Sequence, residues 1–213
     1  MAVVTISRQF GAGGTTLGKK IAKLLGYIFI SDEIITMVAK KAKVSPDWVK
    51  SVEREAGGKL QKFISTIVPR GLVDRILDDQ RGYIDEEIYV DLLGQIINKI
   101  ADEGNCVILG RGGQYILKDR SDAYHVLLIA NDAYRTNFME KQYNLSHTEA
   151  VHTIAAEDKR RTNLYRKIGR LDYDRPEHYH LTLNTSRMDL DVATGMIQSL
   201  ILGNGQAPAE SKF

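Results

Sequence analysis

A glycine-rich segment near the start of the chain contains the residue types needed to hold a phosphate group. Glycines let the backbone approach an anion closely. The free N–H groups at the start of a following helix then point at that anion, aided by the helix dipole. The segment is followed by two hydroxyl side chains and an amphipathic run. Its candidate phosphate-binding residues are Gly11, Ala12, Gly13, Gly14, Thr15 and Thr16.

This segment departs from the common phosphate-loop pattern G-x-x-x-x-G-K-[ST]. Laid on the chain, the pattern has Arg8 in place of its first glycine and Gly14 in place of its lysine. That lysine normally reaches the β- and γ-phosphates. Arg8 could supply the cation from the front of the loop, whereas Lys19 and Lys20 are expected to be too far along the helix. The other interpretation is a tight strand-to-helix turn that binds nothing, because glycine turns are common.

Arginines recur where predicted strands end and in one very polar predicted helix. Phosphoryl transfer needs positioning and cations, because negative charge crowds between donor and acceptor. The planar guanidinium group suits this task, since it holds phosphate oxygens in pairs. Taken singly, Arg111 or Arg135 is equally well explained by a surface ion pair, and the run 157–161 by a solvated helix face. The candidates are Arg8, Arg111, Arg135, Arg160 and Arg161.

The pattern of apolar residues predicts the elements that would position these side chains. Short β-branched runs predict strands, and runs with apolar residues at helical spacing predict helices between them. Alternating strands and helices predict an α/β fold with a parallel sheet covered on both faces. Ligands of such sheets bind beyond the carboxyl ends of the strands, so the glycine loop, Asp32, the turn at 110–113 and Asn184 should converge there. The predicted strands are 3–6, 27–30, 106–109, 123–130 and 179–183.

The chain resembles the cytidylate kinase-like family, a branch of the nucleoside monophosphate kinases. The resemblance is carried by ISRQFGAGGTTLGKKIAKLLGY, followed by ISDEII, and it extends over most of the chain. In that branch the loop often reads S-R-x-F-G-x-G-G and lacks the lysine. The resemblance implies a three-layer P-loop kinase fold with a five-stranded parallel sheet. Its expected parts are a core at 1–43 and 105–202, a helical acceptor-binding insert at 44–104, a lid at 145–177 and a flexible tail at 203–213.

The resemblance also implies roles for several residues. Arg111 matches the arginine of the G-R-D segment after the third strand, although Gly112 replaces its aspartate. ANDAYR matches A-S-x-x-x-R, so Arg135 would hold the acceptor phosphate or the transferred group. In the D-x-x-R segment of the lid, Asp158 would contact the nucleotide ribose and Arg161 the phosphate.

The roles of two further residues stay open. Asp32 matches the aspartate that opens the acceptor-binding helix of the family, but its position also suits a helix cap. Asn184 replaces the aspartate of the family's D-[ST] ending to the last strand. These departures leave the preference for base and sugar open.

The implied activity is ATP-dependent phosphorylation of a nucleoside monophosphate, with CMP or dCMP as the first expectation. Mg²⁺ would bridge the donor phosphates, with Thr15 as its protein ligand. One alternative is a kinase for another small acceptor. The other is a nucleotide-binding sensory protein without turnover, which the missing loop lysine favours.

Composition narrows the remaining classes of function. The net charge of +2 and the isoelectric point near 8.5 are too mild to indicate a membrane or nucleic-acid partner. The basic and aromatic stretch at 164–181 would suit nucleic acid, but its interleaved acidic residues argue against this. We expect nucleotide substrates as partners and a cytoplasmic location, because no secretory signal or membrane-length segment is present. The sequence leaves a homodimer open.

Cysteine and histidine offer little further chemistry. The single cysteine, Cys106, excludes an internal disulfide and lies in the apolar run CVILG, so it is expected in the core rather than as a reactive thiol. His178 and His180 are expected to alternate on a strand, but the five histidines show no convincing metal spacing.

Overall fold

The computed structural model describes residues 1–31 and 86–203. Asp32, most of the expected insert at 44–104 and nearly all of the expected tail at 203–213 lie outside the described residues. The division of the chain into core, insert and lid therefore stays a prediction.

Five parallel strands form one sheet in the order β2-β3-β1-β4-β5. All five match strands expected from the apolar pattern, within a few residues at their ends. β1 is two residues longer than expected, because Ser7 and Arg8 pair with Leu127 and Leu128 of β4. The bounds are β1 Val3–Arg8, β2 Ile28–Ile30, β3 Cys106–Leu109, β4 Ala123–Ile129 and β5 Leu181–Asn184.

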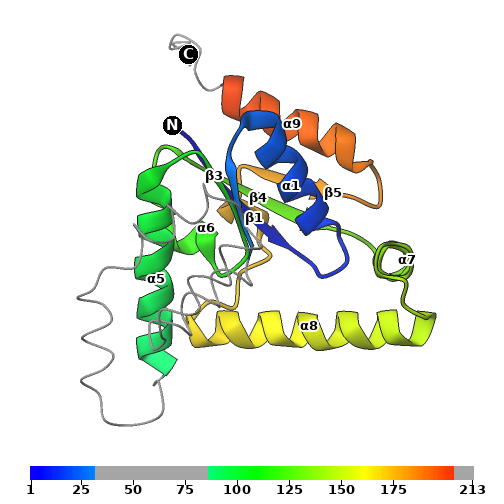
Figure 1. Ribbon diagram of the computed structural model, residues 1–213. Helices are drawn as coiled ribbons and strands as arrows, with labels where there is room; N and C mark the ends of the chain where they lie inside the picture. The colour runs from blue at the N-terminus through cyan, green and yellow to red at the C-terminus, as the bar shows by residue number, and fades with distance from the viewer. Residues whose placement is uncertain (32–85, 204–213) are drawn as a thin grey trace, which may run out of the picture.

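Helices cover both faces of this sheet (Figure 1). Helices α1 (Gly14–Leu25) and α9 (Leu190–Gly203) pack together on one face, while α5 (Glu86–Glu103) and α6 (Gly113–Ile116) lie on the other. The core between sheet and helices includes fully buried Val4, Ile6, Leu17 and Ile21. This is the three-layer arrangement expected from alternating strands and helices.

Two more helices lie near the carboxyl ends of the strands. α7 (Asp132–Tyr143) follows β4, and α8 (His147–Lys167) runs across this edge, at the bottom of Figure 1. A capping box between Ser146 and Glu149 fixes where α8 begins. α8 is longer than the helix expected at 148–164, and its last turns carry Tyr165, which is 2% exposed.

The segment before β5 differs from its prediction. A 3₁₀ turn spans Pro176–His178, and the strand begins only at Leu181. Proline favours the first position of a helical turn, because its φ is fixed and its missing N–H is not needed there. The prediction that His178 and His180 alternate on a strand was therefore wrong.

Cys106 lies in the core, as predicted. It is fully buried, and burial raises the pKa of its thiol to about 12. Over 1–31 and 86–203, no helix is both long enough and apolar enough to cross a membrane.

Candidate phosphate-binding site

The glycine segment forms a loop between β1 and α1. Gly11 and Gly13 have φ of 83° and 84°, in the left-handed region that favours glycine. Gly13 is the N-cap of α1, so the first N–H groups of the helix face the loop. The hydroxyl of Thr185, just after β5, donates to the carbonyl oxygen of buried Ala12 at 3.0 Å and ties the loop to the sheet.

A pocket lies directly over this loop, and we call it the loop pocket. It is lined by Arg8, by the loop residues Gly11, Gly13, Gly14, Thr15 and Thr16, and by an apolar wall of Phe10, Phe138, Met139 and Tyr143. Backbone N–H groups and threonine hydroxyls are suited to an anion. An apolar wall beside them is suited to a ring.

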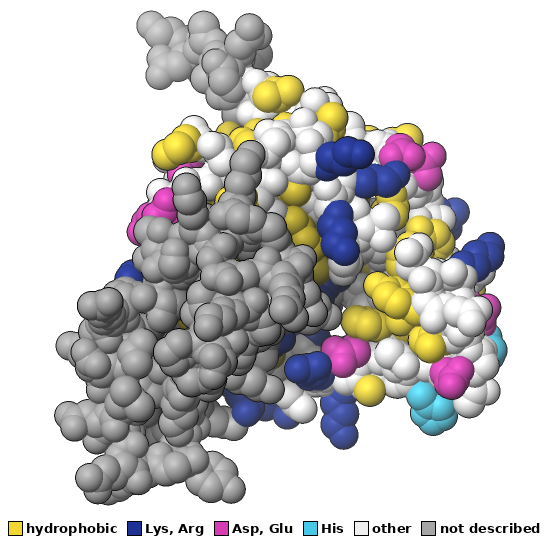
Figure 2. Space-filling model, viewed as in Figure 1, with side chains coloured by type: hydrophobic (Ala, Val, Ile, Leu, Met, Phe, Trp, Pro, Cys, Tyr) yellow, Lys and Arg dark blue, Asp and Glu magenta, His cyan; other side chains and the backbone are white. Residues whose placement is uncertain are grey.

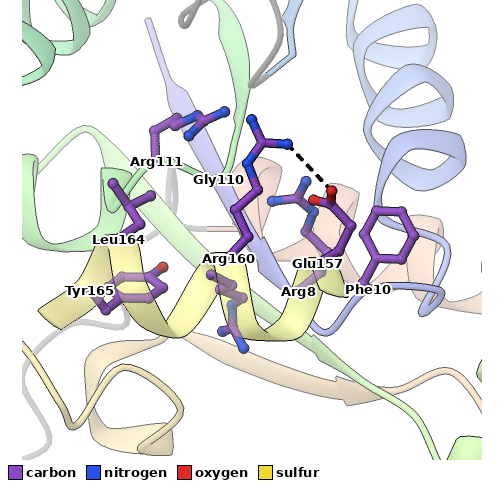
Figure 3. A pocket seen from close by; sticks show the side chains of 9 residues that line it. Arg8, Phe10, Gly110, Arg111, Glu157, Arg160, Leu164 and Tyr165 are labelled. Atoms are coloured by element: carbon purple, nitrogen blue, oxygen red, sulfur yellow. Dashed lines mark hydrogen bonds and ion pairs between the residues drawn. The ribbon is translucent and has the colours of Figure 1, made fainter. Parts of the chain in front are cut away.

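A second pocket, the arginine pocket, opens beside the first. Its described lining includes four arginines, Arg8, Arg111, Arg160 and Arg161, against one acidic residue, Glu157. Figure 3 shows the labelled side chains of Arg8, Arg111 and Arg160 around this space, above α8. Figure 2 shows Lys and Arg side chains gathered along the middle of this face of the molecule. The surplus of positive charge is suited to phosphate oxygens.

Arg111 owes its place to an unusual backbone turn after β3. Gly110, Arg111 and Gly112 all have positive φ, of 76°, 57° and 72°. Such a conformation is uncommon for a residue other than glycine, and strained positions of this kind cluster at functional sites. The turn ends β3 and points the chain back into α6, with Gly112 as the N-cap.

Arg161 reaches the site from α8, held by several contacts. Its guanidinium forms a bidentate ion pair with Asp174, and Nη2 donates to Ser7 Oγ at 3.3 Å. It also lies 4.8 Å from the ring centroid of Tyr173. Burial lowers the pKa of Arg161, but the hydrogen bonds to Asp174 raise it above the usual value. The cation is therefore permanent and its orientation is fixed.

Arg160 contrasts with its neighbour. Its side chain is 63% exposed, and its partner among the described residues is Glu157, whose carboxylate lies 3.3 Å from Nη1 (Figure 3). An exposed ion pair of this kind is weak, so the Arg160 side chain is free to turn toward a ligand.

Arg135 and Asp158 lie beneath the glycine loop and bond to each other. Arg135 Nη1 donates to Asp158 Oδ2 at 2.5 Å, and its Nη2 donates to Asp132 Oδ1 at 2.6 Å. Burial lowers the pKa of Arg135, yet the hydrogen bonds to Asp132 and Asp158 raise it overall. The other oxygen of Asp158 accepts from the N–H of Phe10 at 3.2 Å. This pair joins α7, α8 and the loop, and Arg135 lines neither of the two pockets.

Sequence comparison relates the chain to proteins already classified. Residues 3–187 match the family described as the Cytidylate kinase-like family. The chain belongs to the cytidylate kinase-like family. Among curated proteins, the cytidylate kinase of Pyrococcus horikoshii is 25% identical to it over 199 residues, which are 93% of this chain and 88% of that protein.

Solved structures share the fold of this cytidylate kinase-like chain. An uncharacterized protein from Eubacterium ventriosum has a TM-score of 0.66 at 19% identity, covering 94% of this chain and 98% of the other. Shikimate kinase from Bacteroides thetaiotaomicron has a TM-score of 0.50 at 14% identity, with the same coverage. Likeness at these identities concerns the fold alone. The expected P-loop kinase fold is confirmed.

The structure brings most of the predicted site residues of this cytidylate kinase-like chain to one edge of the sheet. The glycine loop and the turn at 110–113 meet there, as the strand pattern predicted. Lys20 points away and pairs with Asp191 of α9, as expected from its place in the helix. Asp32 lies outside the described residues.

Several residues of the site were not predicted. Gln114 Nε2 donates to the hydroxyls of Tyr165 and Tyr179 at 2.9 and 3.0 Å, and the Tyr165 hydroxyl lies 3.2 Å from Ser7 Oγ. This buried polar cluster joins β1, α6, α8 and the segment before β5. Gln114 is 3% exposed, which is unusual for a glutamine. Because burial cannot be read from a single sequence, no signal in the sequence pointed to this cluster.

Proposed function

We propose that this chain is an ATP-dependent kinase that phosphorylates a nucleoside monophosphate, with CMP or dCMP as the preferred acceptor. The observation that supports this most is the position of Arg8, which lines both the loop pocket and the arginine pocket. One guanidinium group can therefore contact phosphates in both. The loop pocket is suited to the donor phosphates and the arginine pocket to the acceptor phosphate.

The residues of the loop pocket fit ATP and Mg²⁺. The N–H groups at the start of α1 would hold the donor phosphates. Mg²⁺ keeps several waters and takes few protein ligands beside substrate phosphates, so the hydroxyl of Thr15 would suffice as its protein ligand. The bound ion would neutralise charge on the transferred phosphoryl group.

The arginines would do most of what the protein contributes to the reaction. Phosphoryl transfer requires little covalent chemistry from the enzyme, and most of the catalysis is positioning and neutralisation of charge. Arg8 would lie between donor and acceptor, with Arg111 and Arg160 on the acceptor side. Arg161 would join them from a fixed orientation, since Asp174 and Ser7 hold it.

The role expected for Arg135 changes in this proposal. Its guanidinium bonds to Asp132 and Asp158, so we assign it to holding the loop in shape rather than to direct contact with the acceptor phosphate. Asp158 would likewise act through the loop, although its ribose contact stays a prediction.

The direct test is release of ADP in a coupled assay with Mg-ATP. The acceptors would be CMP, dCMP, UMP, AMP and GMP, with a control lacking acceptor. We expect turnover with a pyrimidine monophosphate. Binding of ATP with no turnover on any acceptor would favour the alternative that the chain is a sensory nucleotide-binding protein, to which the missing loop lysine points.

A variant ties this activity to the proposed site. Arg8→Ala should weaken ATP binding or turnover by on the order of 2 kcal/mol, or about 30-fold, because a charge-assisted contact is lost. Arg166→Ala is the matched control, since Arg166 is exposed on α8 and contacts Asn163 at 3.4 Å. An unchanged rate in Arg8→Ala would remove Arg8 from the mechanism.

A further inference from the structure

Gly14 occupies the position at which the common phosphate-loop pattern has its lysine. Unlike Gly11 and Gly13, it is not among the glycines with positive φ, and it is the first residue of α1. Any residue can adopt the backbone conformation found there. The glycine at this position therefore needs an explanation other than backbone conformation.

The explanation is the space taken by Arg8. A Cβ added to Gly14 would lie 2.9 Å from Cγ of Arg8 and 3.3 Å from its Cβ and Cδ. Carbon atoms that are not bonded pack at about 3.5–4.0 Å. The stem of Arg8 thus lies across the start of α1, in the space where the side chain of a lysine at position 14 would begin.

We infer that Gly14 is a positioning residue for Arg8, and that Arg8 delivers from the end of β1 the cation that other loops carry on their lysine. This inference rests on the proposed function, since it concerns the cation that contacts donor phosphates. The two arrangements exclude each other in this loop. Either Arg8 lies across a glycine, or a side chain at position 14 takes the same space.

Carrying the cation on Arg8 rather than on a lysine at position 14 also changes which phosphate groups it can contact. Arg8 lines the loop pocket and the arginine pocket, and its side chain lies beside those of Glu157 and Arg160 in Figure 3. A guanidinium group has a planar fork of donors, whereas an ammonium group is a compact point charge. Arg8 can therefore bond two phosphate groups at once, at the junction between the pockets.

The test is a double-mutant cycle read by binding of Mg-ATP in calorimetry. The variants are Gly14→Ala, Arg8→Ala, the two combined, and Arg8→Ala with Gly14→Lys. Gly195→Ala is the matched control, because Gly195 lies in α9 and a Cβ there would meet nothing within 4 Å. Thermal melting without nucleotide accompanies each variant, to separate loss of folding from loss of binding.

We expect Gly14→Ala to weaken binding at least about tenfold in the natural background, and less than about twofold when Arg8 is already alanine. Gly195→Ala should bind as the natural protein does. Arg8→Ala with Gly14→Lys should regain part of the lost affinity, because a lysine then occupies the vacated space. A folded Gly14→Ala variant supports the inference only if its effect depends on Arg8.

Three results would overturn the inference. In the first, Gly14→Ala binds as tightly as the natural protein, or loses the same factor in both backgrounds. In the second, the lysine variant binds no more tightly than Arg8→Ala alone, so that no exchange of cations has occurred. In either case the natural protein still binds Mg-ATP, and the proposed function stands. In the third, the natural protein itself fails to bind Mg-ATP. That result would contradict both the inference about Gly14 and the proposed function.

Discussion

Replacing Asp158 by alanine should release α8 from the glycine loop. The carboxylate of Asp158 accepts two hydrogen bonds, from Arg135 Nη1 at 2.5 Å and from the N–H of Phe10 at 3.2 Å. Arg135 is the more buried partner, with 10% of its side chain exposed against 34% for Asp158. The substitution leaves a buried cation with Asp132 as its remaining acidic partner among the described residues, and it removes the acceptor of the Phe10 N–H.

The size of the effect follows from these exposures. Breaking a fully buried ion pair costs about 3–5 kcal/mol, and an exposed pair contributes about 0–1 kcal/mol. Since a third of the Asp158 side chain faces water, we expect an intermediate loss of about 2 kcal/mol in the free energy of unfolding. In a domain of this size that is a fall of about 4–8 °C in the melting temperature.

Thermal and urea unfolding without nucleotide would measure the loss. Glu157→Ala is the matched control, because Glu157 is the preceding residue of α8, is equally exposed at 34%, and within the described part of the chain pairs with Arg160, whose side chain is 63% exposed. The control should lose less than about 0.5 kcal/mol. Asp158→Asn should fall between the two, since the amide oxygen still accepts from Phe10. If Asp158→Ala melted together with Glu157→Ala, Asp158 would not hold α8 to the loop.

Two further predictions concern buried titratable groups. Burial, together with nearby His180, lowers the pKa of His125 from 6.5 to about 4. Between these values the unfolded chain binds more protons than the folded one, so stability should fall by up to about 3 kcal/mol as the pH drops through this window. Urea unfolding across the window should show a flatter dependence in His125→Gln, and an equal slope in both proteins would contradict the assignment. The thiol of Cys106 should resist a thiol reagent in the folded protein and react fully in denaturant, because burial raises its pKa to about 12; rapid labelling of folded protein would show that the core opens there.

The fold was largely predictable because its signals are local. The runs at 106–109 and 123–130 are mostly apolar, and they are strands β3 and β4 almost residue for residue. The glycine at position 26 ends α1 in a left-handed conformation, as its place after an amphipathic run predicted. The error before β5 arose where β propensity competed with Pro176, which favours a helical turn.

The sequence predicted which residue types form the site, but not which protein groups these side chains bond to. The resemblance implied that Arg135, Asp158 and Arg161 contact a nucleotide, and this stays a prediction. The structure adds that each is bonded to another protein group. Asp174, which holds Arg161, is 13 residues away, and nothing in the sequence pattern pairs the two. Contacts of this kind depend on how distant segments meet in space, and one sequence does not encode them in its periodicity.

The hydrogen bond from Phe10 to Asp158 gives the loop a built-in reporter of motion. Phe10 belongs to the loop and Asp158 to α8, so the amide proton of Phe10 is shielded only while the two are in contact. Amide hydrogen exchange occurs when such a bond opens, and its rate measures the free energy of that opening. The exchange of a single proton in this loop therefore records how often α8 leaves the carboxyl edge of the sheet, without any label and in the absence of substrate.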